Sequence, residues 1–369
     1  MKNKTKIIFL VSEFLPGPGG IGNQAYCLSK YLSQSDFELI IIAPNRVSFN
    51  SRSFDTQEKI RILRYLNSSF FKIFHIIYLL LTQYIRNKEA ILLSSGQLPI
   101  IIIGFFSKLF NSKNIAISHG HETKMGNKIF KKLTTYAIKQ YDQIIAVSQF
   151  SGNNFKKKIS KDRITIINNG VDINRFEKQN TIKRKNNNHL NLITLGSLSA
   201  RKGQHNVINA LPFLKKHFTK IKYHMVGPEN IKNELLDLAI SLKVDDLIQF
   251  HGYLDDLQLS KLFYSSDVFL MLSENQKNGD VEGFGIAILE ANYFGLPAIG
   301  SKGCGIEDAI KNNETGVLVD SDSPRQIKIA LEKILNNYTY FSNQSRAWAQ
   351  NHDWSKVSKD YINLLNKLN

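Results

Sequence analysis

Short runs of aliphatic and β-branched residues alternate with longer stretches of helical periodicity, and this alternation constrains the fold more than any other feature. In the first half, strands are predicted at residues 7–11, 37–43, 90–94, 114–118, 143–147 and 164–167. Helices are predicted between them at residues 23–33, 71–84, 99–110, 126–139 and 149–158. Such alternation is typical of a doubly wound α/β domain with a parallel sheet.

The alternation stops at a polar stretch and then begins again. Residues 177–188 are charged and aperiodic, which predicts a surface loop or linker. A second series of strands is predicted at residues 191–195, 222–226, 248–250, 268–272, 298–300 and 316–319. At 369 residues the chain is long for a single core. We therefore expect two Rossmann-like α/β domains facing a cleft, at residues 1–176 and 177–353. An amphipathic helix at 354–369 is expected to pack back towards the first domain.

The formal net charge of +17 bears on the partners of the protein. It can reflect compositional bias alone, or attraction to anionic lipid or to phosphorylated ligands. We expect no nucleic acid, because no helix-turn-helix, zinc or RNA-binding signature accompanies the charge. Cys27 and Cys304 lie in no CxxC motif or histidine cluster, which argues against a disulfide framework and fits a reducing cytoplasm.

Three apolar stretches raise the question of a membrane. The run at residues 7–11 is too short for the core of a signal peptide and predicts a buried strand instead. Residues 70–81 and 98–110 fall short of the roughly 18 apolar residues of a transmembrane helix. We expect core-facing helices there. The alternative is that one of them docks on a membrane surface, since Lys72 and Lys108 lie within them.

Two glutamates eight positions apart, Glu282 and Glu290, flank a glycine-containing turn. Gly283-Phe284-Gly285 precedes an apolar run that predicts a helix, so Glu282 is expected in the loop and Glu290 about two turns along. Eight helical positions span about 12 Å. The two carboxylates of a glycosidase are about 5 Å or roughly 6.5–9.5 Å apart. The pair therefore indicates two anchors for two parts of one long ligand.

Two glycine-containing loops are candidate phosphate sites. Gly19 and Gly20 lie between the first strand and the first helix, where backbone amides can face a diphosphate. That loop lacks the GxGxxG spacing of dinucleotide folds, and many such turns are purely structural. Arg201 and Lys202 precede Gly203 after the first strand of the second domain, a position that suits a diphosphate leaving group. The alternative is a solvated basic pair.

His119 follows a predicted strand, in a loop where an imidazole can act as an acid, a base or a hydrogen-bond donor. With His121 it could form a metal pair, but no third and fourth ligand follow at suitable spacing, so we expect no metal. Residues 169–172 contain an Asn-Gly turn and are expected at the domain boundary.

Taken in order, these motifs resemble those of the retaining glycosyltransferases of family 4, which have the two-domain GT-B fold. The form of residues 279–285 is most similar to bacterial mannosyl- and glucosyltransferases acting on lipids or surface polysaccharides. The matching segments run over nearly the whole chain: residues 19–20, 119–120, 147–148, 169–172, 201–203, 250–252, 282–291, 295–297 and 315–319.

The resemblance implies a role for each matching residue. Glu282 would bind hydroxyls of the donor sugar, Glu290 the ribose, and Lys202 with Arg201 the diphosphate. His119 would face the sugar and the acceptor, so Glu282, His119 and Lys202 are the expected catalytic residues. The leaving phosphate itself would take the acceptor proton, with no metal or cofactor. Further donor contacts are implied at Gly19, Gly20, Gly227, Tyr253, Leu254, Gly283, Phe284 and Gly285.

The implied function is transfer of a hexose from a nucleoside-diphosphate sugar to a glycan or glycolipid acceptor in cell-surface polysaccharide or lipopolysaccharide synthesis. The implied location is the cytoplasm or the inner face of the plasma membrane. One position departs from the family: many members carry arginine where this chain has Ser197, in the donor site. Either Arg201 substitutes for that guanidinium or phosphate binding is weaker. A catalytically silent nucleotide- or glycan-binding subunit and a sugar-nucleotide 2-epimerase remain alternatives.

Overall fold

A computed structural model describes residues 4–17, 19–46, 50–67, 71–109, 111–156, 158–176 and 189–368. The chain divides into two compact units. Unit 1 comprises Met1–Gly170 with Trp354–Asn369, and unit 2 comprises Val171–Asp353. The expected linker at residues 177–188 lies outside the described residues. Within the described part, no helix is long and apolar enough to cross a membrane.

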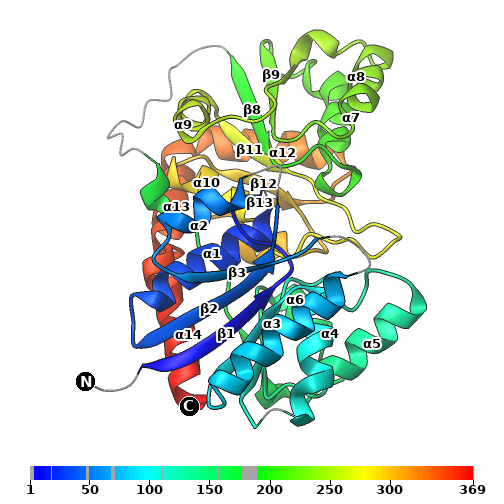
Figure 1. Ribbon diagram of the computed structural model, residues 1–369. Helices are drawn as coiled ribbons and strands as arrows, with labels where there is room; N and C mark the ends of the chain where they lie inside the picture. The colour runs from blue at the N-terminus through cyan, green and yellow to red at the C-terminus, as the bar shows by residue number, and fades with distance from the viewer. Residues whose placement is uncertain are drawn as a thin grey trace. The chain divides into compact units, whose positions relative to one another are not determined.

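The described part of unit 1 contains a parallel sheet of seven strands (Figure 1). Their order is β3-β2-β1-β4-β5-β6-β7. All six strands predicted in this half are confirmed, and β3 is additional. Their bounds are β1 Thr5–Val11, β2 Phe37–Pro44, β3 Arg61–Tyr65, β4 Ile91–Ser95, β5 Asn114–Ser118, β6 Gln143–Ala146 and β7 Ile164–Ile166.

Helices connect these strands and cover the sheet. The predicted helices at 99–110 and 149–158 end earlier, at Phe106 and Asn153, and residues 110 and 157 lie outside the described part. The last helix contributes Tyr361, whose hydroxyl accepts a hydrogen bond of 3.2 Å from Gln24 of the first. The bounds are α1 Gly20–Ser33, α2 Ser51–Gln57, α3 Lys72–Arg86, α4 Gln97–Phe106, α5 Lys128–Ile138, α6 Gln149–Asn153 and α14 Trp354–Leu368, with a 3-10 turn η2 at Ser107–Leu109.

The two apolar segments of unit 1 differ in their burial. α4 is buried from Pro99 to Gly104, as expected of a core-facing helix. Gly104 lies so close to α5 that a Cβ there would come within 2.7 Å of the Cβ of Ala137. α3 buries Ile76, Leu80 and Gln83, which form a single stripe at helical spacing. The expectation of a core-facing helix therefore holds for α4 and for only one face of α3.

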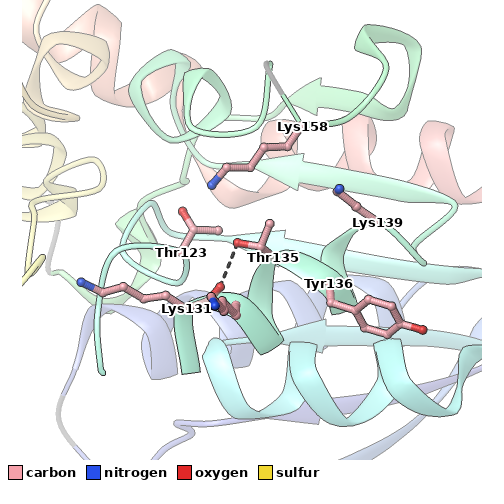
Figure 2. Close-up of a pocket in the computed structure, with 7 residues that line it drawn as sticks. Thr123, Lys131, Thr135, Tyr136, Lys139 and Lys158 are labelled. Atoms are coloured by element: carbon pink, nitrogen blue, oxygen red, sulfur yellow. Dashed lines mark hydrogen bonds between the residues drawn. The ribbon is translucent and has the colours of Figure 1, made fainter. Parts of the chain in front are cut away.

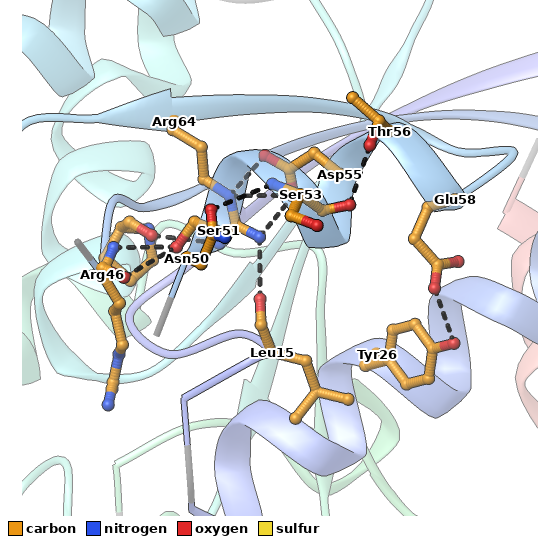
Figure 3. Close-up of polar contacts among 11 residues, drawn as sticks. Leu15, Tyr26, Arg46, Asn50, Ser51, Ser53, Asp55, Thr56, Glu58 and Arg64 are labelled. Atoms are coloured by element: carbon orange, nitrogen blue, oxygen red, sulfur yellow. Dashed lines mark hydrogen bonds and ion pairs between the residues drawn. The ribbon is translucent and has the colours of Figure 1, made fainter. Parts of the chain in front are cut away.

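The short elements α2 and β3 were not predicted from the sequence. They are joined by Arg64, a nearly buried side chain that donates to the Asp55 carboxylate at 2.6 and 2.9 Å (Figure 3). The same guanidinium donates to the carbonyl oxygens of Pro44 and Leu15 at 3.0 and 2.7 Å. Arg64 thus ties α2 and the edge of the sheet to the loop after β1, which leads to Gly19.

In unit 2 the described residues form a six-stranded parallel sheet in the order β10-β9-β8-β11-β12-β13. All six predicted strands are confirmed. The strands are β8 Leu190–Leu195, β9 Ile221–Val226, β10 Ile248–Phe250, β11 Val268–Met271, β12 Ala298–Ser301 and β13 Gly316–Val319. The helices are α7 Gln204–Leu214, α8 Lys232–Ser241, α9 Asp256–Ser265, α10 Ile286–Tyr293, α11 Ile306–Ala309, α12 Pro324–Asn336 and α13 Tyr338–Asn351.

The strand order of unit 2 reverses between β8 and β11. β9 follows β8 on one side, whereas β11, β12 and β13 continue on the other side. The connections after β8 and β11 therefore leave the same edge of the sheet in opposite directions. Ligands of open α/β sheets bind at such a switch point.

Candidate active site

Four charged side chains from two neighbouring loops meet at this edge of unit 2. Arg201 and Lys202 lie in a 3-10 turn, η5 Ala200–Lys202, after β8; Asp280 and Glu282 lie between β11 and α10. Lys202 Nζ is 2.8 Å from Glu282 Oε2, and Arg201 Nε is 3.1 Å from Asp280 Oδ2. Arg201 Nη1 also pairs with Glu282 Oε2. We call these four residues the charged cluster.

The cluster keeps a buried carboxylate ionised. Burial by itself would raise the pKa of Glu282, which is 8% exposed, but Lys202 and Arg201 outweigh this effect and hold it below its usual value. Burial would lower the pKa of Arg201, whereas Glu282 and Asp280 hold it above its usual value. The cluster therefore places a hydrogen-bond acceptor for hydroxyl groups beside two cationic groups suited to phosphate.

Backbone contacts hold the two loops of the cluster together. Gly203 precedes α7 with a φ of +73°, and a Cβ there would lie 1.8 Å from the carbonyl oxygen of Leu272. No side chain fits at this position, so the predicted glycine is required by close approach as well as by φ. Glu274 N donates to Arg201 O at 2.9 Å. The loop that carries the cations thus rests directly on the end of β11.

The helix after the cluster begins where the sequence predicts it, directly after the Gly283-Phe284-Gly285 turn. Gly285 has a φ of +96°, and α10 begins at the next residue, so only the second half of the interval from Glu282 to Glu290 is helical. The predicted separation of 12 Å assumed a helix throughout and is wrong in that premise; the helical half rises about 6 Å. The ring of Phe284 is buried in unit 2, and the carbonyl oxygen of Gly283 lies 2.0 Å from where a Cβ of Gly305 would be.

Glu290 has a partner that no sequence motif indicated. Arg175 Nη1 lies 2.8 Å from Glu290 Oε1, and Arg175 Nη2 and Nε lie 2.5 and 3.0 Å from Asp256 Oδ1. Burial would lower the pKa of Arg175, but Glu290 and Asp256 hold it above its usual value. Within the described residues, no hydrogen bond reaches Glu290 Oε2, so this oxygen can accept one from a ligand. The only signal in the sequence is a basic residue three positions after the motif at 169–172.

Three glycine turns bring the loops after β8, β9 and β10 together. Gly196, Gly227 and Gly252 have φ values of +146°, +135° and +62°. A Cβ at Gly227 would lie 2.4 Å from the carbonyl oxygen of Gly196, and Gly227 N donates to Gly252 O at 2.8 Å. Tyr253, which is 81% exposed, and the half-buried Leu254 follow directly. Gly227, Tyr253 and Leu254, at which the family resemblance implies donor contacts, therefore lie along one edge of the unit 2 sheet, beside the turn that begins the cluster.

The absence of an arginine at Ser197 is not offset by a free guanidinium. Arg201 is already paired with two carboxylates of the cluster. Lys202, in contrast, extends over the backbone of Gly196: its Cε lies 3.2 Å from where a Cβ of Gly196 would be. Ser197 is half-buried, and its carbonyl oxygen accepts a hydrogen bond of 3.2 Å from Gln204. Lys202 is thus the cation that reaches this loop.

In unit 1, His119 lies directly after β5 and is 6% exposed. Its Nε2 is 2.8 Å from the hydroxyl oxygen of Ser95, which ends β4. Burial lowers the pKa of His119 to about 4, despite the opposing effect of Glu122. The imidazole is therefore neutral at physiological pH and acts as a hydrogen-bonding group.

Glu122 fixes the backbone around His119 through hydrogen bonds. The sequence analysis did not identify Glu122 as a site residue. Its carboxylate accepts hydrogen bonds from His119 N at 2.6 Å, Gly120 N at 2.9 Å and the Ser118 hydroxyl at 2.8 Å. Glu122 is fully buried; burial would raise its pKa, but His121, His119 and the backbone amides hold it below the usual value. The signal was local, since an acid four residues after a strand end can accept hydrogen bonds from the amides that precede it.

Gly19 and Gly20 begin α1. Gly19 has a φ of +142°, and the Glu13 carboxylate lies 2.4 Å from where its Cβ would be. A Cβ at Gly20 would meet no atom within 4 Å among the described residues, and Gly20 is exposed at the helix start. Helix N-termini of this kind bind anions. Among the described residues, no group of three or more potential metal ligands is present.

Comparison with known proteins identifies the family. The Glycosyltransferase Family 4 domain matches residues 18–175, and the domain Glycosyl transferases group 1 matches residues 175–353. Together they span nearly all of both units.

Individual proteins agree with this assignment. An uncharacterized glycosyltransferase of Methanocaldococcus jannaschii is 24% identical, over 99% of this chain and 99% of its own length. The GDP-mannose-dependent alpha-(1-6)-phosphatidylinositol monomannoside mannosyltransferase of Mycobacterium tuberculosis is 26% identical, over 61% of this chain and 60% of its own length. Among solved structures, Anabaena HepE in complex with UDP-glucose has a TM-score of 0.80 at 17% identity, over 98% of this chain and 100% of that one.

The structural likeness to HepE shows only that the two chains share a fold. The activity of this chain follows from the family matches. The two parallel α/β sheets are those of the GT-B fold. The chain belongs to glycosyltransferase family 4 and is an enzyme that transfers a sugar from a nucleotide sugar.

Proposed function

We propose that this enzyme transfers a hexose, with retention of anomeric configuration, from a nucleoside-diphosphate sugar to a glycan or lipid-linked acceptor. The observation that carries the proposal is the charged cluster, in which an ionised Glu282 lies beside Lys202 at the switch point of unit 2. A nucleoside-diphosphate sugar offers hydroxyl groups and phosphate oxygens in sequence along one molecule. The cluster offers an acceptor and a cation in the same succession.

The donor is proposed to lie along the carboxyl edge of the unit 2 sheet. Glu282 accepts hydrogen bonds from sugar hydroxyls, and Lys202 binds the diphosphate. Glu290, held through one oxygen by Arg175, accepts from the ribose hydroxyls with the other. The base lies against the glycine turns near Gly227. Each role uses the charge state or the free hydrogen-bonding capacity of the residue as the structure has it.

The chemical step is proposed to proceed on one face of the sugar. The bond between the anomeric carbon and the diphosphate oxygen breaks, and the acceptor hydroxyl forms the new bond on the same face. The acceptor proton passes to the leaving diphosphate, so no protein base is required. Lys202 stabilises the negative charge that develops on that diphosphate. Neutral His119 contributes a hydrogen bond rather than a charge.

The acceptor class is proposed from the relatives. One relative acts on a phosphatidylinositol monomannoside, which is a lipid-borne glycan. We propose that this chain likewise extends a lipid-linked or surface glycan, and that it works in the cytoplasm at an anionic membrane face. The net charge of +17 supports such a location, because anionic lipid attracts basic proteins.

A donor screen tests the proposal. The enzyme is incubated with UDP- and GDP-hexoses and a membrane lipid extract, and release of nucleoside diphosphate is measured beside the mass of the product. Glu282→Gln is expected to lower turnover at least about 100-fold, because it removes the charge of the sugar-binding acceptor. Glu234→Gln, an exposed acid on α8, is the matched control. Nucleotide binding without release, or wild-type turnover by Glu282→Gln, would contradict the proposal.

A further inference from the structure

One face of α3 is apolar and exposed. Opposite its buried stripe, Phe74, Tyr78 and Ile85 are 70%, 63% and 65% exposed. These positions repeat at helical spacing and so line a single face. A helix that is apolar on both sides is normally buried or lies in a membrane. Among the described residues nothing covers this face, so α3 presents an apolar surface to its surroundings.

The neighbouring helices extend this apolar face. Tyr84 of α3 accepts a hydrogen bond of 2.8 Å from Asn111 N, just beyond η2, which places α3 beside the end of α4. α4 packs on α5, where the exposed rings of Phe105 and Tyr136 lie 5.2 Å apart between centroids. Leu109, 72% exposed, lies at the end of η2. We call α3, α4, η2 and α5 the outer helical layer of unit 1.

A basic pocket opens at one end of this layer. Figure 2 shows the residues that line it beside α5. Its cavity volume is about 430 Å³. No acidic side chain lines it, and among the described residues none of its ammonium groups has a carboxylate within ion-pairing distance. The hydroxyl of Thr123 adds hydrogen-bonding capacity to the cationic charge, whereas that of Thr135 donates to the carbonyl oxygen of Lys131 at 2.8 Å. The lining residues are Thr123, Lys131, Lys132, Thr135, Tyr136, Lys139 and Lys158.

The charge of the chain is concentrated around the same layer. Residues 71–163 contain 15 Lys and Arg against 4 Asp and Glu, a net charge of +11 out of +17 for the whole chain. A quarter of the sequence thus carries about two thirds of the charge. A surface that combines exposed aromatic side chains with lysines complements one kind of partner in particular, the headgroup region of an anionic bilayer.

We propose that the outer helical layer docks unit 1 on an anionic phospholipid surface, with the apolar face of α3 in the interface and a lipid phosphate in the lysine pocket. This inference rests on the proposed function, which places the acceptor at a membrane, and it assigns the surface involved. Aromatic and aliphatic side chains enter the boundary between headgroups and acyl chains, while the lysines neutralise the phosphates.

Vesicle sedimentation tests the proposal, with phosphatidylcholine vesicles compared with vesicles that also contain phosphatidylglycerol. We expect binding to the anionic vesicles only, and weakening at high salt. Phe74→Ser with Tyr78→Ser should lower the partition coefficient about tenfold or more. Lys132→Glu with Lys139→Glu should lower it by a similar factor and reduce its salt dependence.

Two matched controls lie in unit 2. Ile240→Ser with Ile329→Ser removes apolar side chains that are 53% and 52% exposed. Lys216→Glu with Lys220→Glu changes the net charge equally at exposed positions. Both are expected to bind vesicles as the wild type does. Circular dichroism confirms that each variant is folded, and nucleoside-diphosphate release in detergent solution reports the proposed function separately.

Each other result overturns the proposal. Equal binding to neutral vesicles would contradict the role of charge, and equal loss in the unit 2 controls would contradict the assigned surface. Displacement from vesicles by inorganic phosphate, beyond that caused by sodium chloride at the same ionic strength, would indicate a site for a free anion. A dimer of wild type that Phe74→Ser with Tyr78→Ser converts to monomer would show that a second copy covers α3.

Discussion

Replacing Lys202 by methionine removes the ammonium group of the charged cluster while keeping most of the apolar length of the side chain. Its side chain is 14% exposed, so the group acts in a partly water-excluded site. At about 4 Å and an effective dielectric constant of about 20, one unit charge stabilises another by about 4 kcal/mol. Loss of one preorganised donor to a developing negative charge lowers kcat by about 10²–10³. Both figures point to a decrease of two to three orders of magnitude.

The neighbouring arginine provides a comparison within the cluster. Arg201 is paired with Asp280 and Glu282, so Arg201→Met should disturb the carboxylates more than the phosphate and lower kcat only about tenfold. The assay is steady-state release of nucleoside diphosphate with donor concentration varied. Lys216→Met, an exposed lysine elsewhere in unit 2, controls for loss of charge.

Two results would refute this reasoning. If Lys202→Met retained kcat within about threefold while Arg201→Met lost it, the phosphate would be bound by the guanidinium. If Lys202→Met raised only the KM for the donor, Lys202 would bind ground state and transition state equally. Urea unfolding of Lys202→Met shows whether either result comes from a loss of stability. We expect little loss, since Arg201 still neutralises Glu282 in this variant.

Four further predictions follow from the described contacts. Ser197→Arg should lower the KM for the donor about tenfold, because it adds a guanidinium beside the phosphate loop; an unchanged KM would contradict this. Arg175→Met should raise that KM about tenfold with little change in kcat, since it removes the ion pair that holds Oε1 of Glu290 in place. The pKa of His119 is about 4 in the folded protein and about 6.5 in the unfolded chain. Neutral His119 therefore contributes about 3 kcal/mol of stability that is present above pH 6.5 and is lost as pH falls towards 4. Chemical denaturation across this pH range should show this loss of stability, and His119→Gln should remove the pH dependence. Arg64→Ala should lower the free energy of unfolding by about 2–4 kcal/mol, because it leaves several acceptors without donors, and a change below 0.5 kcal/mol in urea unfolding would contradict this.

Most of the fold could be predicted because the buried strands of a parallel sheet are largely continuous apolar runs, as in the second half of β2 and the whole of β11. β3 was not predicted from the sequence because an edge strand needs no continuous apolar run. It contains Arg61 and Arg64, and of its residues only Tyr65 is buried. α6 was predicted too long. It ends at Asn153, directly after Gly152, a residue type that disfavours a helix interior. The capping box of Ser148 and Ser151 fixes only its start.

The site was predictable where its determinants are local. Gly196, Gly227 and Gly252 follow strand ends within two residues, and each has a positive φ that favours glycine. Glu282 comes directly before the Gly283-Phe284-Gly285 turn that precedes α10. The pairing of Arg175 with Glu290 joins positions 115 residues apart, and no spacing rule connects them. Ion pairs of this kind depend on how strands are ordered in the sheet, which local patterns do not encode.

The contact between Gly203 and the end of β11 has a consequence for how donor specificity could change. The backbone contact at Gly203 holds the two loops at a fixed separation. The distance between the ammonium group of Lys202 and the carboxylate of Glu282 is therefore fixed as well. Substitutions in the loop between β11 and α10 can then reshape the sugar pocket without altering the register of the phosphate. Any residue larger than glycine at position 203 would instead push the two loops apart and lengthen the distance between Lys202 and Glu282. That single change would alter sugar and phosphate recognition together.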